Sequence, residues 1–388
     1  MSETARTPPQ DAALGLYVHW PYCARICPYC DFNVYRARGA DAEALTRAML
    51  ADLDRWRART GPRRLSSLHF GGGTPSLMAP DAVAAVIARA DALWGFEPGA
   101  EIGLEANPKE AGRLAGLKHA GISRVSLGVQ ALDDADLKRL GRDHGAAEAL
   151  DAFETARALF ARVSIDLIYA RENQTPDSWA RELEAVLALH PDHLSLYQLT
   201  IEPGTAFAKA FERGALTPPD PDAAAEMYEI AQAMTRQAGL SGYEISNHAR
   251  TRGDESAHNR LYWAGADWIG IGPGAHSRLG AHAWGGRTGF EAAARPERYI
   301  ARVETGAGHA ETALSALEEA QERVLMGMRV IEGLDRARLR ALTGLDVDTS
   351  AAERFAADGL LTVSGERVTL TDAGRLFADR IASELAPS

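Results

Sequence analysis

The stretch Tyr17-Val-His-Trp-Pro-Tyr-Cys23-Ala-Arg-Ile-Cys27-Pro-Tyr-Cys30-Asp-Phe32 contains all three cysteines of this 388-residue chain. They are spaced C-x3-C-x2-C and follow a short apolar run. Three thiolates on one tight loop can bind three irons of a 4Fe-4S cluster, which leaves the fourth iron an open coordination position. The pattern therefore predicts a reactive iron-sulfur site held by Cys23, Cys27 and Cys30.

Two other uses of the cysteines stay open at this point. A structural zinc ion would need a fourth ligand, which His19 or Asp31 would supply, although such sites usually have two separated ligand pairs. Disulfides would leave one of the three thiols unpaired, and nothing else in the chain is typical of a secreted disulfide framework.

Composition indicates a large cytoplasmic protein. The chain is 46% hydrophobic, enough for a full core, and its length suggests two or three domains or one barrel with an appendage. Its formal charge of −11, without a basic tract, argues against nucleic acid or an anionic membrane as the main partner. The polar start resembles no signal peptide, and an apolar run long enough for an integral membrane protein is missing.

Short strand-like runs alternate with longer amphipathic runs, a pattern typical of parallel βαβ units in an α/β fold. Acidic residues near the helix starts support the helix assignments. The strands are expected at Leu16 to Trp20, Ser67 to Phe70, Glu101 to Glu105, Arg124 to Val129, Val163 to Tyr169 and His193 to Leu199. The clearest helices are expected at Asp41 to Ala58, Pro80 to Trp94, Pro108 to Ala120, Ala147 to Leu159 and Pro176 to Leu189.

Candidate ligand residues follow the ends of these strands. Gly71-Gly72-Gly73-Thr74-Pro75 comes directly after Phe70, and consecutive glycines let the backbone approach a ligand, although a plain turn would use them too. Glu105 in Glu105-Ala-Asn107-Pro108 would suit ribose hydroxyls, unless Asn107 is only a helix cap. Gln130, Arg142 and Asp166 occupy similar positions along the chain.

Together the cysteine spacing and these strand-end motifs resemble the radical S-adenosylmethionine (radical SAM) superfamily. The resemblance implies a partial (β/α)6 barrel with chemistry at the carboxyl ends of the strands. It also implies that the open iron binds SAM, and that reduction of the cluster splits SAM to give a 5′-deoxyadenosyl radical. It makes the three cysteines the cluster ligands and places the following residues around SAM: Tyr17, Tyr29, Gly72, Gly73, Thr74, Glu105, Gln130, Arg142 and Asp166.

Within that superfamily the chain resembles the group of coproporphyrinogen III dehydrogenases (HemN) and heme chaperones (HemW), from Tyr17 to Leu385. The dehydrogenases have a further cysteine after the cluster motif and a longer arm before it, whereas Cys30 here is followed by Asp31-Phe32. The segment His258-Asn259-Arg-Leu-Tyr262-Trp263 matches a motif proposed for heme binding in the chaperones. A histidine packed under two aromatics is the alternative. The loop at Ala170 to Thr175 departs from the group because it lacks a Gly/Pro turn.

The resemblance therefore implies a heme chaperone with a 4Fe-4S cluster and SAM. Such a protein would pass heme to acceptor hemoproteins, such as respiratory-chain proteins, and would need an electron donor. The alternatives are an oxygen-independent coproporphyrinogen III dehydrogenase, which the missing cysteine disfavours, and a related radical SAM methyltransferase or cyclopropanase.

The rest of the chain carries weaker signals. Gly270-Ile-Gly272-Pro-Gly274-Ala275 has the letters of a dinucleotide motif but not the surrounding βαβ unit, so a tight loop closing the barrel mouth is expected. The hairpin pattern Leu361 to Leu370 predicts a winged-helix-like α+β module, in which acidic residues outnumber basic ones and DNA binding is disfavoured. The expected division is a polar tail at 1–14, the barrel at 15–250, a connecting segment at 251–312 and the winged-helix-like domain at 313–388.

Overall fold

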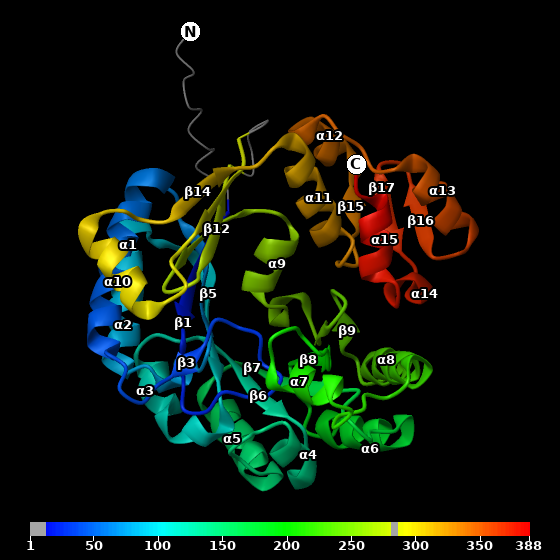
Figure 1. The fold of residues 1–388 in the computed structure, drawn as a ribbon, viewed down its shortest axis with the longest axis horizontal. Coiled ribbons are helices and arrows are strands. Elements are labelled where there is room, and N and C mark those ends of the chain that lie inside the picture. The colour runs from blue at the N-terminus through cyan, green and yellow to red at the C-terminus, as the bar shows by residue number, and fades with distance from the viewer. Residues whose placement is uncertain (1–12, 281–285) are drawn as a thin grey trace.

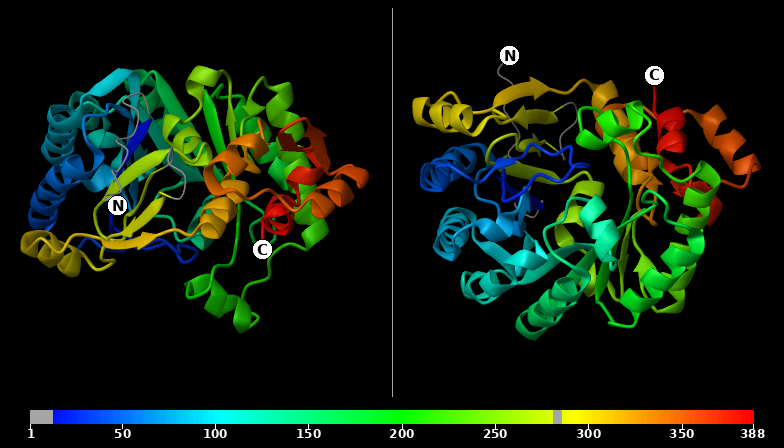
Figure 2. Two further views of the ribbon diagram at one scale, coloured as in Figure 1. Left: turned by 90° about the horizontal axis from the view of Figure 1, so that it is seen from above. Right: turned by 60° about the horizontal axis from the view of Figure 1, so that its bottom comes forward.

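A twelve-stranded sheet forms the centre of the computed structural model, which describes residues 13–280 and 286–388 (Figure 1). Seven neighbouring strands of this sheet are parallel. In sheet order they are β11 (Asp267–Ile271), β1 (Leu14–Trp20), β4 (Leu65–Gly72), β5 (Phe96–Ala106), β6 (Arg124–Gln130), β7 (Arg162–Tyr169) and β8 (His193–Gln198). The sheet curves into an open barrel, as the two views of Figure 2 show.

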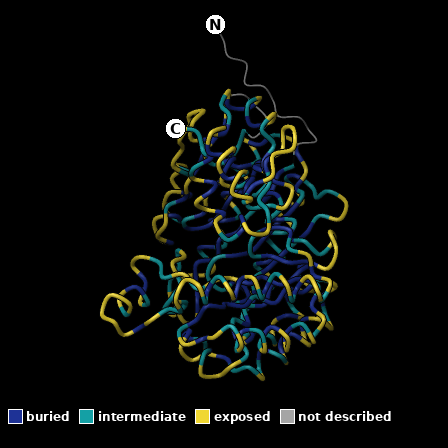
Figure 3. The backbone as a smooth tube through the Cα atoms, turned by 90° about the vertical axis from the view of Figure 1, so that its right-hand side faces the viewer, coloured by how far each residue is buried: buried dark blue, intermediate teal, exposed yellow. Residues whose placement is uncertain are grey.

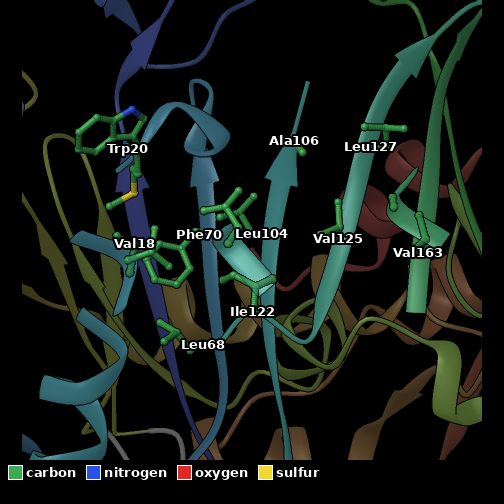
Figure 4. Packing of buried hydrophobic residues seen from close by; sticks show 14 of the residues in the cluster. Val18, Trp20, Leu68, Phe70, Leu104, Ala106, Ile122, Val125, Leu127 and Val163 are labelled. Carbon is green, nitrogen blue, oxygen red and sulfur yellow. The ribbon is translucent and has the colours of Figure 1, made fainter. Parts of the chain in front are cut away.

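Helices cover the convex face of the sheet. Those that follow the strands are α1 (Ala42–Thr60), α2 (Pro80–Trp94), η2 (Pro108–Arg113), α3 (Leu114–His119), α4 (Asp134–Arg139), α5 (Ala146–Leu159), α6 (Pro176–Leu187) and α8 (Pro221–Gln237); the short turn η1 (Pro75–Leu77) follows β4. Helix α7 (Ala206–Glu212) lies instead against the cysteine loop, where the Phe207 N–H donates to Pro28 O. Apolar side chains at alternate strand positions pack beneath these helices, as Val18, Phe70 and Leu127 illustrate (Figure 4). Figure 3 shows the buried backbone concentrated inside the molecule, with exposed turns at the helix surface.

The predicted α/β class and radical SAM-type barrel are confirmed. Each of the six expected strands forms, and four of the five expected helices form with shifts of a few residues at their ends. The stretch expected as one helix from Pro108 to Ala120 is divided into a 3-10 turn and a short α-helix.

One expectation from the sequence is wrong. Gly270 and Ile271, which were expected in a tight loop, belong to β11, a fully buried strand that pairs in parallel with β1. A β carbon at Gly270 would lie 2.4 Å from the backbone oxygen of His276, so the glycine lets two backbones approach closely. The loop itself begins only at Gly272, where φ is +99°.

Short strands extend the sheet beyond the parallel part. On the β11 side lie the antiparallel strands β12 (His276–Leu279), β13 (Thr288–Glu291) and β14 (Ala310–Ala313), with α10 (Pro296–Thr305) between the last two. On the β8 side lie β10 (Asn247–Ala249) and β9 (Ser241–Gly242). A separate two-stranded pair, β2 (Tyr22–Cys23) and β3 (Tyr35–Arg36), encloses the cysteine loop.

The C-terminal part has a hydrophobic cluster of its own, which includes Val324, Phe355, Val368 and Ile381. It comprises α11 (Ala316–Gly327), β15 (Leu334–Asp335), α12 (Arg336–Thr343), α13 (Thr349–Ala357), β16 (Leu361–Ser364), β17 (Arg367–Leu370), α14 (Asp372–Arg375) and α15 (Ala378–Leu385). The expected hairpin is confirmed as β16 and β17, and β15 makes it three-stranded.

Helix α9 (Ala257–Trp263), with the turn η3 (Arg252–Asp254) before it, lies on the concave side of the sheet, between the strands and the C-terminal part (Figure 1). It contacts β1, β4, β5 and β11 on one side and α11 on the other. None of the described helices has both the length and the apolar character required to cross a bilayer.

Candidate functional site

Polar side chains occupy the concave face of the barrel strands. They alternate with the apolar residues that pack under the helices, because successive side chains of a strand point to opposite faces. The strand register places Tyr17 beside His69, Glu105 beside Ser126, and Gly128 beside Asp166. The concave face near the carboxyl strand ends is therefore a continuous polar surface.

The cysteine loop leaves the end of β1. Cys23 is buried and Cys27 and Cys30 are partly exposed, and all three line one pocket together with Thr74, Asn107 and Arg142. Burial raises the pKa of the Cys23 thiol, and a hydrogen bond with Thr74 opposes that rise. Burial also raises the pKa of Cys30 to about 11. Burial therefore favours the protonated form of these two thiols.

The glycine loop packs directly against the cysteine loop. The Gly73 N–H donates to Trp20 O at 2.7 Å, and the Thr74 N–H donates to Tyr22 O at 3.0 Å. Gly72 has φ +109°, a conformation that favours glycine. A β carbon at Gly73 would lie 2.9 Å from Cys23 Sγ, so the third glycine is required where the two loops meet.

The neighbouring glycine faces a different part of the site. A β carbon at Gly71 would lie 2.8 Å from Tyr17 Cε2 and 2.9 Å from Glu105 Oε1. Glu105 in turn accepts from the Gly72 N–H at 3.3 Å and lies 3.2 Å from His69 Nε2. The glycine loop therefore connects the cysteines on one side with Tyr17 and Glu105 on the other.

Gln130 and Asp166 lie on the next two strands. Gln130 has φ +70°, rare for a residue with a side chain, at a register shift between β6 and β7, and its buried Oε1 has no hydrogen-bond partner. Asp166 accepts from the Ser126 hydroxyl at 2.9 Å and from the Ser164 hydroxyl at 3.3 Å. Burial raises the pKa of Asp166, and hydrogen bonds with Ser195 and Ser126 oppose that rise.

Arg142 connects the barrel end to the cysteines. Its Nη1 donates to Cys27 Sγ at 3.3 Å and its Nη2 to Gly128 O at 3.3 Å, while its buried Nε has no partner. Tyr29 lies beside Arg142 and Cys27, with its ring 6.2 Å from that of Phe207, and burial raises its pKa. A guanidinium at this place would contact both a cluster ligand and a ligand bound at the barrel end.

These features favour a cluster over a zinc ion. Both ring nitrogens of His19 are engaged, Nδ1 with the Tyr17 hydroxyl at 3.2 Å and Nε2 with Asn33 O at 2.9 Å, so His19 is not available as a fourth ligand. Across 13–280 and 286–388, no three His, Cys, Asp or Glu side chains converge as they would around a single metal ion. Three sulfurs on one loop suit separate irons of one cluster instead.

The barrel end also suits SAM. Gln130 Oε1 and Arg142 Nε are buried polar atoms without partners in the described structure, which is the state expected of groups that bind a polar ligand. Glycines remove side chains from the same place. These residues would bind and orient the ligand, whereas a cluster in the cysteine pocket would supply the electron that cleaves it.

The predicted heme motif lies on α9, and two of its residues face the barrel interior. His258 is 4% exposed, stacks on His69 with ring centroids 4.6 Å apart and on Tyr17 at 5.6 Å, and meets the Tyr262 ring edge-on at 4.4 Å. Burial lowers the pKa of His258 well below its usual range, so the imidazole is neutral. Its buried Nδ1 has no partner among the described residues and keeps the ability to bind a metal.

The other two residues of the motif face elsewhere. Trp263 lies under the guanidinium of Arg329 from the C-terminal part, which is 5.0 Å from the ring centre. The Asn259 N–H donates to Ser256 Oγ, which caps α9, and its side chain interacts with Tyr243. The four residues therefore do not gather around one ligand space, because positions one turn apart share a helix face and adjacent positions do not.

Sequence reasoning missed His69 and the buried charges below it. Arg124 lies 3.8 Å from Glu101, which also pairs with Arg162 at 3.1 Å and accepts from the Ala257 N–H. A signal was available, since Ser67 and His69 alternate with Leu68 and Phe70 in a buried strand and so must point into the barrel. The loop after β7, at Ala170 to Thr175, is the one that lacks the Gly/Pro turn of the group. Its residue Arg171 is buried and pairs with Asp136 and Glu182, and these ion pairs hold the loop in place.

Comparisons with known proteins agree with this geometry. A family model of the radical SAM superfamily matches residues 17–186, and a model of the HemN C-terminal domain matches residues 314–377. The chain is 42% identical over 340 residues to the mitochondrial radical S-adenosyl methionine domain-containing protein 1 of Bos taurus, covering 84% of this chain and 76% of the relative.

Bacterial relatives cover almost the whole chain. The heme chaperone HemW of Mycobacterium tuberculosis is 36% identical, with 96% of this chain and 94% of the relative aligned. Among solved structures, coproporphyrinogen III oxidase (HemN) from Escherichia coli superposes with a TM-score of 0.82 over 97% of this chain and 91% of its own, at 23% identity. That structural similarity shows the fold alone.

Proposed function

Because the chain belongs to the HemN/HemW group of the radical SAM superfamily, we propose that it is a cytoplasmic heme chaperone that binds heme and passes it to acceptor hemoproteins. Membership of the superfamily implies a 4Fe-4S cluster and SAM, and the paired cysteine and glycine loops suit both. The observation that carries the proposal is the near full-length similarity to proteins named heme chaperone.

The structure supports His258 as a ligand of heme iron. A neutral imidazole with one unengaged nitrogen is a suitable axial ligand, and Tyr262 is placed to pack against a bound ring. His258 is enclosed by Tyr17 and His69, so α9 would have to move for heme to reach it. His258 also contacts Tyr17, one of the residues expected around SAM.

The first prediction separates a carrier from an enzyme. With its cluster reconstituted anaerobically and with SAM and reductant present, the purified chain is expected to bind hemin but not to convert coproporphyrinogen III to protoporphyrinogen IX. The reason is that Asp31 stands where the resemblance to the dehydrogenases would require a further cysteine. Hemin binding is measured by absorbance titration and turnover by chromatography of the porphyrins. Repeated turnover would support a dehydrogenase instead.

The second prediction concerns the iron ligand. His258→Ala is expected to change the absorption and EPR spectra of bound heme, because loss of an axial imidazole alters iron coordination directly. Cluster content should stay the same, since His258 does not contact the cysteine loop. His69→Ala is the matched control, because it also removes a ring from the stack. Heme spectra that are identical in His258→Ala and the parent would assign the iron ligand to another residue.

A further inference from the structure

Two residues, Pro28 and Tyr29, separate the second cysteine from the third, and parts of the chain outside the cysteine motif hold them in place. A β carbon at Gly141, just after α4, would lie 2.5 Å from Pro28 Cδ, so this glycine lets the proline approach closely. The Phe207 N–H, in the first turn of α7, donates to Pro28 O at 2.9 Å. The segment between two cluster ligands is therefore held by α7 as well as by the end of α4.

The side chain of Phe207 also packs on the cysteine loop. Its ring centroid lies 6.2 Å from that of Tyr29, and both rings pack against a small hydrophobic cluster made of Ala131, Leu137 and Leu140. An aromatic pair at this distance contributes stability beyond that of the apolar area it buries. The Phe207 ring therefore stabilises one position of the Tyr29 ring.

Tyr29 in turn borders the place where a guanidinium meets a cluster ligand. Its side chain interacts with both Arg142 and Cys27, and Arg142 Nη1 donates to Cys27 Sγ at 3.3 Å. Hydrogen bonds to the sulfurs and access of solvent are among the features by which a protein tunes an iron-sulfur cluster. A change at Phe207 would therefore reach the surroundings of Cys27 through one intervening ring.

Helix α7 is loosely packed apart from this aromatic contact. A hollow of about 200 Å³ lies beside it, lined by residues that include Leu140, Leu199 and Leu216. The glycines on either side of the helix, Gly204 and Gly214, have φ of +84° and +67°, and a β carbon at either would meet no atom within 4 Å. Figure 2 shows this green segment projecting from the barrel in the left view. The aromatic contact therefore has a large share in keeping α7 on the cysteine loop.

We propose that Phe207 is a positioning residue for the iron-sulfur cluster. It packs on Tyr29 and so keeps Cys27 in contact with Arg142. Phe207 acts through Tyr29 and is not itself a ligand of the cluster. The inference concerns the cysteine loop alone, so it can be tested separately from heme binding.

The test compares Phe207→Ala with the parent in two states of the full chain. After anaerobic reconstitution, the variant is expected to lose its cluster in air about tenfold faster, because Tyr29 loses the ring that holds it and the loop opens more often. The EPR spectrum of the reduced cluster should change as well. In the metal-free chain, iodoacetamide should modify Cys27 and Cys30 faster, as measured by mass spectrometry. Phe207→Tyr should restore all three properties, because it keeps the aromatic ring.

Phe211→Ala is the matched control, because it makes the same change in the same helix at a side chain that is 50% exposed. Its cluster lifetime, EPR spectrum and thiol reactivity should match those of the parent. In a Tyr29→Ala background, Phe207→Ala should have little further effect, since the two residues act as one unit. Circular dichroism checks that each variant is folded.

Two results would overturn the proposal. One is a Phe207→Ala variant that equals the parent in cluster lifetime, EPR spectrum and thiol reactivity. The other is an equal effect of Phe207→Ala and Phe211→Ala, which would assign the effect to the helix and not to the aromatic contact. A parent that binds no heme would contradict the proposed function and leave this comparison intact.

Discussion

Cys27→Ser is expected to abolish the stable iron-sulfur cluster. Anaerobic reconstitution of the parent should give about four irons and four sulfides per chain, whereas the variant should keep less than about a tenth of that iron. The chain has only three cysteines, so no other thiol can replace the lost ligand. The measurements are iron and sulfide content, visible absorption and EPR after reduction.

Ala24→Ser is the control for this experiment. It introduces the same hydroxyl into the same loop at an exposed position and removes no sulfur, so cluster content should match the parent. Cys23→Ser and Cys30→Ser should behave as Cys27→Ser does. A parent that takes up zinc and shows no iron-sulfur absorption would refute the cluster assignment for all three cysteines.

Two substitutions in the glycine loop are expected to separate SAM binding from cluster binding. Gly71→Val places side-chain atoms against Tyr17 and Glu105, so it should weaken SAM binding by more than about tenfold, or about 1.4 kcal/mol, and leave the cluster in place. Gly73→Val places them against Cys23 Sγ and should reduce cluster content instead.

The readouts are the change that SAM causes in the EPR spectrum of the reduced cluster, and the iron content. The two variants are matched because both put the same side chain into one loop, two residues apart. If SAM still changes the EPR spectrum of Gly71→Val as it does that of the parent, and the iron content is full, then this loop does not belong to the SAM site. Full iron content in Gly73→Val would show that the cluster still forms when the glycine loop is pushed away from the cysteine loop.

Much of the barrel could be predicted because each parallel unit is local. The strand that ends at Phe70 and the helix that starts at Pro80 each show a clear hydrophobic period. This period predicts whether the element is buried on one face or on both faces. Strand β11 could not be predicted in this way. It is a short strand of five residues, and its position beside β1 depends on a pairing between residues far apart in the chain.

The candidate site was predictable to a similar extent. The cysteines and glycines have special chemistry or backbone freedom and are visible in a motif, and the structure places both loops in contact. The spread of the heme motif over two sides of α9 was not visible, because it depends on what packs against each side of that helix.

Residues that follow β11 also affect the order in which the protein can mature. The cysteine loop is fastened by Asn33, whose Nδ2 donates to Pro273 O at 2.9 Å and to Ala294 O at 2.8 Å. The cysteines leave the ribosome early, but these two partners of Asn33 follow more than two hundred positions later. Domains fold as units during synthesis, so the loop acquires its native anchor only when most of the chain has been made. The loop is therefore complete in its native contacts only near the end of translation.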